Sequence, residues 1–347
     1  MIASDPRPAT GRRGPFARRG VLLLVGVGLL LGAGGAALLF VDHREATSLT
    51  LKAADDQALG YPTTQALIEM GRLLDRWSGG RIKMEVYYDG QLGNEVTTIR
   101  KTIEGSIDVD RVNLDPLTQV EPLLRAFALP YIFRSQEQMH RVVDGPIGRE
   151  FLDRLKVHGL VGLGYYDSGS RSFYVSRRPI HSLAGLRGLR IRVQNAPIMS
   201  DIVRALGAIP VPMPYEDVYT ALETGVIDGA ENNIPSWVST GHYEVAPYYL
   251  ADAHVRVPEV LIMSEKSWKR LKPADRSLVA RAAAESVTFQ RKLWQKTVAR
   301  ALERAKAAGC RIIVPDDLPA FERATERVYR DYGSQLSNYI DRIRSVP

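Results

Sequence analysis

Two polar side chains near the ends of predicted strands suggest an anion-binding site. Arg192 lies in a run in which Leu189, Ile191 and Val193 alternate with polar residues, a pattern typical of a strand with one apolar face. Asn232 ends a second short run. A guanidinium can hold a carboxylate through two parallel hydrogen bonds, and an amide can donate and accept. These residue types are suited to carboxylate binding, but a strand Arg more commonly pairs with a surface acid, and the residues alone favour that structural role for Arg192.

The segment 185–233 supplies the elements that would position both residues. We expect, in order, a strand at 189–193, a helix at 198–206, a strand at 209–213, a helix at 216–223 and a strand at 225–229 that leads into 230–233. Strands that alternate with helices at this spacing predict a parallel α/β sheet. In such sheets ligands bind beyond the carboxyl ends of the strands, where Arg192 and Asn232 are expected.

No motif of a common enzyme class accompanies these residues. The six His are scattered without the H-E-x-x-H spacing of zinc enzymes, and the single Cys excludes a disulfide framework. The sequence has neither a G-x-S-x-G nucleophile elbow nor a G-x-x-x-x-G-K-[ST] phosphate loop. An enzyme would also need an acid–base pair converging on Arg192, which no recognisable spacing offers. We therefore expect a binding protein without cofactor or metal rather than an enzyme.

The charge distribution argues against a nucleic-acid partner. The formal net charge is +7, but residues 1–40, with five Arg and one Asp, contribute +4 of it. The remaining charge is spread over faces of mixed sign, not gathered in the basic stripe that nucleic-acid binding requires.

The N-terminal region has the pattern of an export signal. Paired Arg at 12–13 and 18–19 precede an apolar run at 21–40. The run approaches the roughly 20 residues that span a bilayer, so it can also be an uncleaved anchor. We predict that residues 1–46 are a signal peptide or an N-terminal membrane anchor, and that the rest is delivered to the periplasm.

Several motifs in order make the chain resemble the solute-binding proteins of TRAP transporters (tripartite ATP-independent periplasmic transporters) of the DctP type. They are Gly-Arg-Ile-Lys at 80–83, Gly-Gln-Leu-Gly-Asn-Glu at 90–95, Leu-Pro-Tyr-Ile-Phe-Arg at 129–134, Gly-Leu-Arg-Ile-Arg-Val at 188–193, Pro-Met-Pro at 212–214, Asp-Val-Tyr-Thr-Ala-Leu at 217–222 and Val-Ile-Asp-Gly-Ala-Glu-Asn at 226–232. The similarity covers roughly residues 49–330.

The resemblance implies a two-lobed, periplasmic-binding-protein-like (type II-like) fold. Two α/β domains would be joined by crossing hinge strands, with one long helix spanning both. We place domain I at 47–168 with 257–296 returning to it, and domain II at 169–256 with 297–347 packing against it. The periodic stretch 273–308 is the expected long helix, and 259–264 the strand that returns to the first domain.

The resemblance also implies the ligand contacts. Arg192 falls where an essential Arg of the family holds the substrate carboxylate, whereas Arg190, on the same strand face, is expected to be structural. A second carboxylate-contacting Arg is implied at Arg171, and a ligand-contacting amide at Asn232. Further candidates, for which a structural role is the alternative, are Tyr215, Asn113, Asn195, Glu95, Asp56, Tyr61 and Trp237.

The expected ligand is an organic acid. Similarity of 111–114 and 167–174 to family members that bind hexuronates favours glucuronate or galacturonate. A C4-dicarboxylate is the alternative, because Arg111 would share a strand face with Asn113 and supply a second cation. A membrane-anchored ligand sensor is another alternative if 21–40 is retained. We expect a monomer that closes on its ligand and delivers it to TRAP membrane permease subunits.

Overall fold

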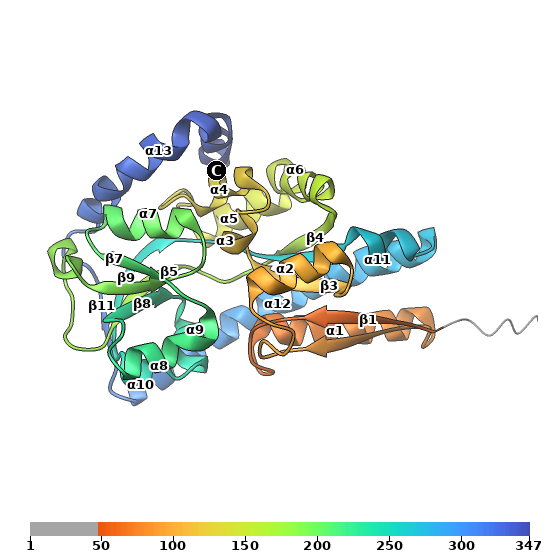
Figure 1. Ribbon diagram of the computed structural model, residues 1–347, viewed down its shortest axis with the longest axis horizontal. Coiled ribbons are helices and arrows are strands. Elements are labelled where there is room, and N and C mark those ends of the chain that lie inside the picture. The colour runs from red at the N-terminus through yellow and green to blue at the C-terminus, as the bar shows by residue number, and fades with distance from the viewer. Residues whose placement is uncertain (1–47) are drawn as a thin grey trace, which may run out of the picture. The chain divides into compact units, whose positions relative to one another are not determined.

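The computed structural model describes residues 48–347 (Figure 1). The signal or anchor expected at 1–46 lies outside these residues. Within 48–347, no helix is both long enough and apolar enough to cross a bilayer. The described chain forms two α/β lobes, each built on its own sheet, which confirms the predicted two-lobed α/β fold.

The first lobe is built on a five-stranded sheet in the order β2-β1-β3-β10-β4. Its strands are β1 (Leu49–Ala54), β2 (Ile82–Tyr87), β3 (Val109–Asn113), β4 (Leu160–Tyr166) and β10 (Glu259–Ser264). Its helices are α1 (Pro62–Ser78), α2 (Glu95–Glu104), α3 (Leu114–Leu117), α4 (Arg125–Ala128), α5 (Gln136–Asp144), α6 (Pro146–Arg154) and α11 (Glu265–Arg270), with 3-10 turns at Pro122–Leu124 and Leu155–His158. Strands β1, β2 and β3 are parallel, whereas β10 is antiparallel to both of its neighbours.

The second lobe is built on a six-stranded sheet in the order β11-β9-β5-β8-β6-β7. Its strands are β5 (Arg171–Val175), β6 (Arg190–Val193), β7 (Ile209–Pro212), β8 (Gly229–Asn232), β9 (Tyr248–Val255) and β11 (Arg311–Ile313). Its helices are α7 (Pro197–Ala205), α8 (Val218–Glu223), α9 (Ile234–Ser239) and α10 (His242–Val245), with 3-10 turns at Leu183–Leu186 and Tyr215–Asp217.

The strands of segment 185–233 are parallel as predicted, because β6 is parallel to both β7 and β8. The whole sheet is mixed, since β5 is antiparallel to β8 and β9. One prediction for this segment is corrected. The strand expected at 225–229 begins only at Gly229. Gly225 has a φ of 71°, and Asp228 turns back to accept a hydrogen bond from the backbone of Arg190 (3.0 Å). The backbone N–H of Ile227 donates to the carbonyl oxygen of Ala221 in α8 (3.2 Å), so the residues directly after Gly225 belong to this turn and not to a strand.

Local sequence signals explain where the first-lobe helices begin and end. Helix α1 starts with Pro62, whose missing N–H has no partner in a first turn anyway, and ends at Gly79 with a φ of 66°. The side chain of Asn94 accepts from the backbone N–H of Thr97 and caps α2. This cap fixes the residue after it, Glu95, at the first position of the helix.

A 35-residue helix, α12 (Pro273–Ala307), packs on both lobes. Its first half contacts α1 and β4, with Val279 and Ala282 in the first-lobe core, and its second half contacts α9, with Ala301 and Ala305 in a second-lobe core. The C-terminal helix α13 (Leu318–Ser345) also packs on elements of both lobes. The predicted helix spanning both lobes is therefore confirmed (Figure 1).

The chain crosses between the sheets at 167–170, between β4 and β5, and again at 256–258, between β9 and β10. Because β5 and β10 enter their sheets from the other lobe, each runs antiparallel to its neighbours. The predicted crossing strands are present, but the domain boundaries given above stay a prediction.

Candidate functional site

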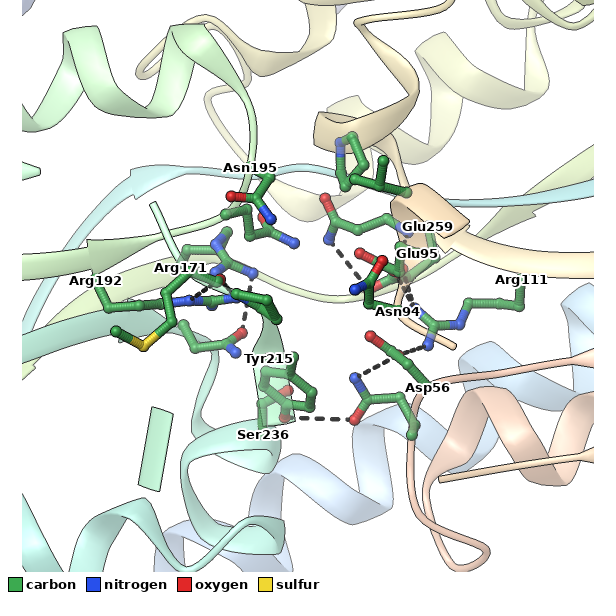
Figure 2. A pocket seen from close by; sticks show the side chains of 18 residues that line it. Asp56, Asn94, Glu95, Arg111, Arg171, Arg192, Asn195, Tyr215, Ser236 and Glu259 are labelled. Atoms are coloured by element: carbon green, nitrogen blue, oxygen red, sulfur yellow. Dashed lines mark hydrogen bonds and ion pairs between the residues drawn. The ribbon is translucent and has the colours of Figure 1, made fainter. Parts of the chain in front are cut away.

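A pocket lies between the two lobes, beyond the carboxyl ends of strands from both sheets (Figure 2). It is lined by Asp56, Gln57, Asn94, Glu95, Val96, Arg111, Asn113, Pro116, Arg171, Arg192, Gln194, Asn195, Met213, Pro214, Tyr215, Asn232, Ser236 and Glu259. Eight of the ten predicted ligand-binding residues are in this lining, and the other two, Tyr61 and Trp237, are not. The structure therefore brings together residues that are up to 176 positions apart in the chain, from Asp56 to Asn232.

Arg192 is a buried guanidinium that has no acidic partner among the described residues. It is the third residue of β6 and is only 3% exposed. Its Nε and Nη2 donate to the carbonyl oxygen of Met213 at 3.0 and 2.8 Å. No carboxylate of residues 48–347 lies within 4.0 Å of it, and burial lowers its pKa from the ordinary value. Nη1 and the second N–H of Nη2 are thus available to an anion in the pocket.

Arg171, by contrast, is held by protein groups. Located at the start of β5, it donates through Nη2 to the carboxylate (2.9 Å) and the carbonyl (2.8 Å) of Glu231, and through Nη1 to the side-chain oxygen of Asn232 (3.0 Å). Burial alone would raise the pKa of the Glu231 carboxyl, but Arg171 and the nearby His254 outweigh it and lower that pKa to about 2. Glu231 therefore orients Arg171, and one N–H of Nη1 is left for a ligand.

The amide of Asn232 presents its donor end to the pocket. Its oxygen already accepts from Arg171 (3.0 Å) and from the backbone N–H of Asn233 (2.9 Å). A carboxamide whose oxygen takes two hydrogen bonds has its NH₂ group left to bind an anion. Arg171, Arg192 and Asn232 thus form a donor set on the second-lobe side of the pocket. Figure 2 shows Arg171 and Arg192 facing the acidic residues across the pocket.

Tyr215 covers the guanidinium of Arg192 and reaches the other lobe. The Cζ of Arg192 lies 5.8 Å from the centre of the Tyr215 ring, a distance at which a cation is attracted to the ring face. The Tyr215 hydroxyl lies 3.5 Å from Oε1 of Gln57 in the first lobe. Burial raises the pKa of Tyr215 to about 12, so the hydroxyl keeps its proton at neutral pH. Asn195 lines the pocket just after β6.

The first-lobe side of the pocket is rich in carboxylates. Asp56 follows β1, Glu95 begins α2, and Glu259 begins β10. Oε1 of Glu95 accepts from the backbone N–H of Asn113 (2.6 Å), and Oε1 of Glu259 lies 3.3 Å from Nδ2 of Asn113. Burial raises the pKa of both Glu95 and Glu259 above the ordinary value. These oxygens accept hydrogen bonds, as the hydroxyl groups of a polyol require.

Arg111 lies at the centre of these carboxylates and is 1% exposed. Its Nε binds Asp55 (3.0 Å), its Nη1 binds Glu95 (3.1 Å) and Glu259 (2.7 Å), and its Nη2 binds Asp55 and Asp56. A guanidinium has five N–H donors, and all five are used. Arg111 is therefore not the free second cation that the dicarboxylate alternative requires.

Tyr61 and Trp237 have other partners. The Tyr61 hydroxyl lies 2.8 Å from Oγ of Ser236, a pocket residue in the second lobe, so Tyr61 contacts the site from behind. Trp237 is fully buried in a second-lobe core, and its indole N–H donates to the carbonyl oxygen of Ala246 (3.0 Å). Of the two roles considered for Trp237, the structure places it in packing rather than in the pocket wall.

Sequence reasoning missed several lining residues. Glu259 enters the pocket because β10 pairs with β3 in a register that sets it opposite Asn113, and nothing local in the sequence indicates that pairing. Ser236 lies one turn into α9, and its helix was not predicted. Gln57 and Asn94 were detectable, because each is the sequence neighbour of a candidate, Asp56 and Glu95 respectively. Among residues 48–347, no cluster of three His, Cys, Asp or Glu side chains is arranged to hold a metal ion.

The sequence matches the profile of the bacterial extracellular solute-binding proteins, family 7 (DctP), over residues 54–335. A solute-binding protein of Chromohalobacter salexigens is 35% identical over 272 residues, which are 78% of this chain and 81% of the relative. The family match covers both lobes and every residue of the pocket lining.

Solved structures of TRAP periplasmic solute-binding proteins have the same fold. The protein from Bradyrhizobium sp. BTAi1, in complex with α/β-D-galacturonate, is 41% identical with a TM-score of 0.83, and the match covers 85% of this chain and 99% of that one. The protein from Pseudomonas putida F1, with bound D-glucuronate, is 37% identical with a TM-score of 0.84, covering 86% and 97% respectively.

Proposed function

Because this chain belongs to family 7 of the bacterial extracellular solute-binding proteins, the DctP-type proteins of TRAP transporters, we propose that it captures a hexuronate such as D-glucuronate or D-galacturonate. The two lobes close on the ligand, and the closed protein delivers it to the TRAP permease subunits in the membrane. The protein acts in the periplasm, to which residues 1–46 direct it. The observation that carries the proposal is the buried guanidinium of Arg192, which has no acidic partner among residues 48–347.

The carboxylate of the ligand is assigned to Arg192. A buried charge without a counter-ion is costly, because the low dielectric of the interior does not replace its hydration. A ligand carboxylate removes this cost and gains charge-assisted hydrogen bonds, which are about twice as strong as neutral ones. The free N–H of Arg171 and the amide of Asn232 complete a donor set whose shape is fixed by Glu231 before the ligand arrives. Such preorganisation increases affinity.

The hydroxyl groups of the ligand are assigned to the first lobe. Asp56 and Glu95 offer carboxylate oxygens, and Asn94 and Asn113 add amides. This set suits the hydroxyl-rich face of a sugar acid. Solved relatives that match over both lobes hold D-galacturonate or D-glucuronate, and their agreement with this polar lining supports the assignment to hexuronates.

Closure explains how a polar pocket binds a hydrated acid. In an open cleft each group is solvated, so each hydrogen bond contributes little net free energy. When the lobes meet, water leaves, and the attraction between Arg192 and the carboxylate strengthens in the lower dielectric. Contacts between the lobes, such as Tyr61 with Ser236 (2.8 Å) and Tyr215 with Gln57 (3.5 Å), form beside the ligand and hold the closed state.

Calorimetric titration of the wild-type protein and an Arg192→Ala variant with D-glucuronate and D-galacturonate tests the proposal. We expect the variant to lose affinity at least about 30-fold, because losing one partner of a buried charged pair costs about 2–5 kcal/mol. It should remain folded, since the change removes an uncompensated buried charge.

The matched control is Arg190→Ala on the same strand, where the guanidinium binds Asp228 (3.0 Å) and Gly225 (2.8 Å) rather than the pocket. Arg190→Ala should keep the wild-type affinity. Equal affinities of Arg192→Ala and wild type would contradict the role of Arg192, and failure of the wild type to bind either hexuronate would contradict the ligand assignment.

A further inference from the structure

One charged group of the pocket is not explained by carboxylate capture. Arg111 is fully buried in the first-lobe wall together with Asp55, Asp56, Glu95 and Glu259, a set that we call the Arg111 cluster. Three of its four acids, Asp56, Glu95 and Glu259, line the pocket, as does Arg111 itself. The wall opposite Arg192 therefore contains four carboxyl groups and one cation.

The guanidinium of Arg111 cannot receive a ligand carboxylate without breaking its own contacts. Each of its five N–H donors is bound to a cluster carboxylate. The acids outnumber the cation, and no N–H of Arg111 is left over, so this wall has no free cation for a further carboxylate. Arg111 instead fixes the positions of the carboxylates, and the pocket-lining Asp56 and Glu95 each keep a second oxygen as a hydrogen-bond acceptor (Figure 2).

From this arrangement we propose that the Arg111 cluster is a charge filter that determines specificity. It accepts ligands whose far end carries hydroxyl groups and rejects ligands with a second carboxylate. Applied to the proposed function, on which it rests, the filter admits sugar acids with one carboxylate and excludes the aldaric diacids of the same carbon skeleton, as well as C4-dicarboxylates.

The free oxygens of Glu95 and Asp56 are the atoms that act on the ligand. Oε1 of Glu95 is used by Arg111 (3.1 Å) and by the backbone N–H of Asn113 (2.6 Å), and Oδ1 of Asp56 is used by Arg111 and by Gln57 (3.2 Å). In each case the second carboxylate oxygen has no hydrogen-bond partner among the described residues. It meets a hydroxyl as an acceptor and a carboxylate as a like charge.

The isosteric variants Glu95→Gln and Asp56→Asn test the filter. Each keeps the oxygen that Arg111 binds and turns the second oxygen into an NH₂ donor, while removing one negative charge. We expect each to raise affinity for a diacid relative to a monoacid on the order of tenfold or more, because like charges separated by a few ångströms repel strongly in a partly buried site. The double variant should shift the ratio further.

Calorimetry would measure the affinity of each protein for D-galacturonate, D-galactonate and D-galactarate. The ratio of D-galactonate to D-galactarate affinity compares a monoacid and a diacid that are both open-chain. The control is Glu104→Gln, which removes one charge from the exposed end of the same helix α2 and should leave every ratio unchanged. Circular dichroism confirms folding, and Asp56→Asn keeps the test available should Glu95→Gln not fold.

The outcomes separate the filter from the proposed function. The filter is supported if the wild type binds monoacids more tightly than diacids and if this difference in affinity is smaller in Glu95→Gln or Asp56→Asn. Wild-type protein that binds D-galacturonate and D-galactarate equally well, or folded variants with unchanged ratios, would overturn the filter and leave hexuronate capture standing. Wild-type protein that binds no hexuronate overturns both.

Discussion

Two arginines on one strand show how the partner, not the residue type, determines the role. Arg190 and Arg192 lie two positions apart on β6. Arg190 is half-exposed and forms a two-pronged pair with Asp228, whose pKa this hydrogen bond lowers. Arg192 is buried, has no acid within 4.0 Å among residues 48–347, and lines the pocket. An exposed pair contributes little to stability, whereas an uncompensated buried cation creates a site for an anion.

The sequence alone could identify Arg192 only through its family resemblance. The alternation on β6 places both arginines on one face, and the acid that distinguishes them is 38 positions away from Arg190 at Asp228. The same limit applies to Arg111. The strand face on which Arg111 lies was predictable, but the binding of all five of its N–H donors was not. The carboxylates that bind them come from three other segments, which meet only when β3 pairs with β1 and β10.

A second residue-scale feature is the buried carboxyl group of Asp115 in α3. It is fully buried, and neither of its oxygens has a hydrogen-bond partner among the described residues. Burial raises its pKa to about 7, against the lowering effect of Arg171. The folded protein therefore holds a proton that the unfolded chain loses near its ordinary pKa of 3.8, and stability must fall as the pH rises from about 4 to 7.

We predict that Asp115→Asn removes this loss. The amide mimics the protonated carboxyl, so the variant should match the wild type near pH 4 and be more stable at pH 8, by up to a few kcal/mol at about 1.4 kcal/mol per pKa unit. Urea unfolding at both pH values measures the difference. Asp331→Asn, on the exposed face of α13, is the control and should show no such divergence. A variant that is less stable than the wild type at pH 8 would contradict the prediction.

At the scale of elements, most regular structure was predictable from periodicity and turn residues. The strand β10 has the predicted bounds, and the long helix α12 ends within one residue of its predicted end. Pro or Gly marks their borders: Pro258 precedes β10, and α12 runs from Pro273 to just before Gly309. The prediction was weakest at 225–233 and 234–255, where helices α9 and α10 and strand β9 were missed. There, short elements obtain their stability from tertiary packing around Trp237 rather than from local signals.

The crossing at 167–170 is an element whose geometry depends on one glycine. Gly169 has a φ of 64°, and its backbone N–H donates to Oδ1 of Asp167 (2.8 Å). A Cβ built there would lie 3.3 Å from the Trp294 ring of α12. The side chain of Gln290, also on α12, binds both backbone groups of Asp167 at 2.9 and 2.8 Å. The long helix thus holds the strand crossing that leads to Arg171.

We predict that Gly169→Ala lowers the free energy of unfolding by more than the cost of backbone strain alone. It should also weaken hexuronate binding. A left-handed φ costs an alanine about 1–2 kcal/mol, and the contact with Trp294 adds to this and displaces the start of β5. The control is Gly79→Ala, which has nearly the same φ of 66° but no atom within 4 Å of the added Cβ. Thermal unfolding and calorimetry should show a larger loss in Gly169→Ala and unchanged affinity in Gly79→Ala. Equal effects of the two substitutions would refute the role of the Trp294 contact.

At the scale of the whole molecule, affinity includes the free energy of bringing the lobes together. Two lobes that close on a ligand bind more tightly when contacts outside the ligand also favour the closed state. Tyr61, at the start of α1 in the first lobe, forms such a contact with Ser236 in α9 of the second lobe (2.8 Å). Burial raises the pKa of the Tyr61 hydroxyl well above its ordinary value, so it stays a neutral donor or acceptor at physiological pH.

We predict that Tyr61→Phe weakens hexuronate binding about threefold to tenfold, since a neutral hydrogen bond contributes about 0.5–1.5 kcal/mol. Unfolding of the ligand-free protein should change little, because the contact requires closure. In small-angle scattering, the variant should become as compact as the wild type at saturating ligand. It should need a higher ligand concentration to reach half of that change. Tyr166→Phe deletes the same kind of bond, to Ser286 at 2.8 Å, but between β4 and α12 on the first-lobe side. Tyr166→Phe should lower the free energy of unfolding and leave the affinity for the ligand unchanged. If Tyr61→Phe instead lowered stability without weakening binding, closure would not depend on the Tyr61 contact.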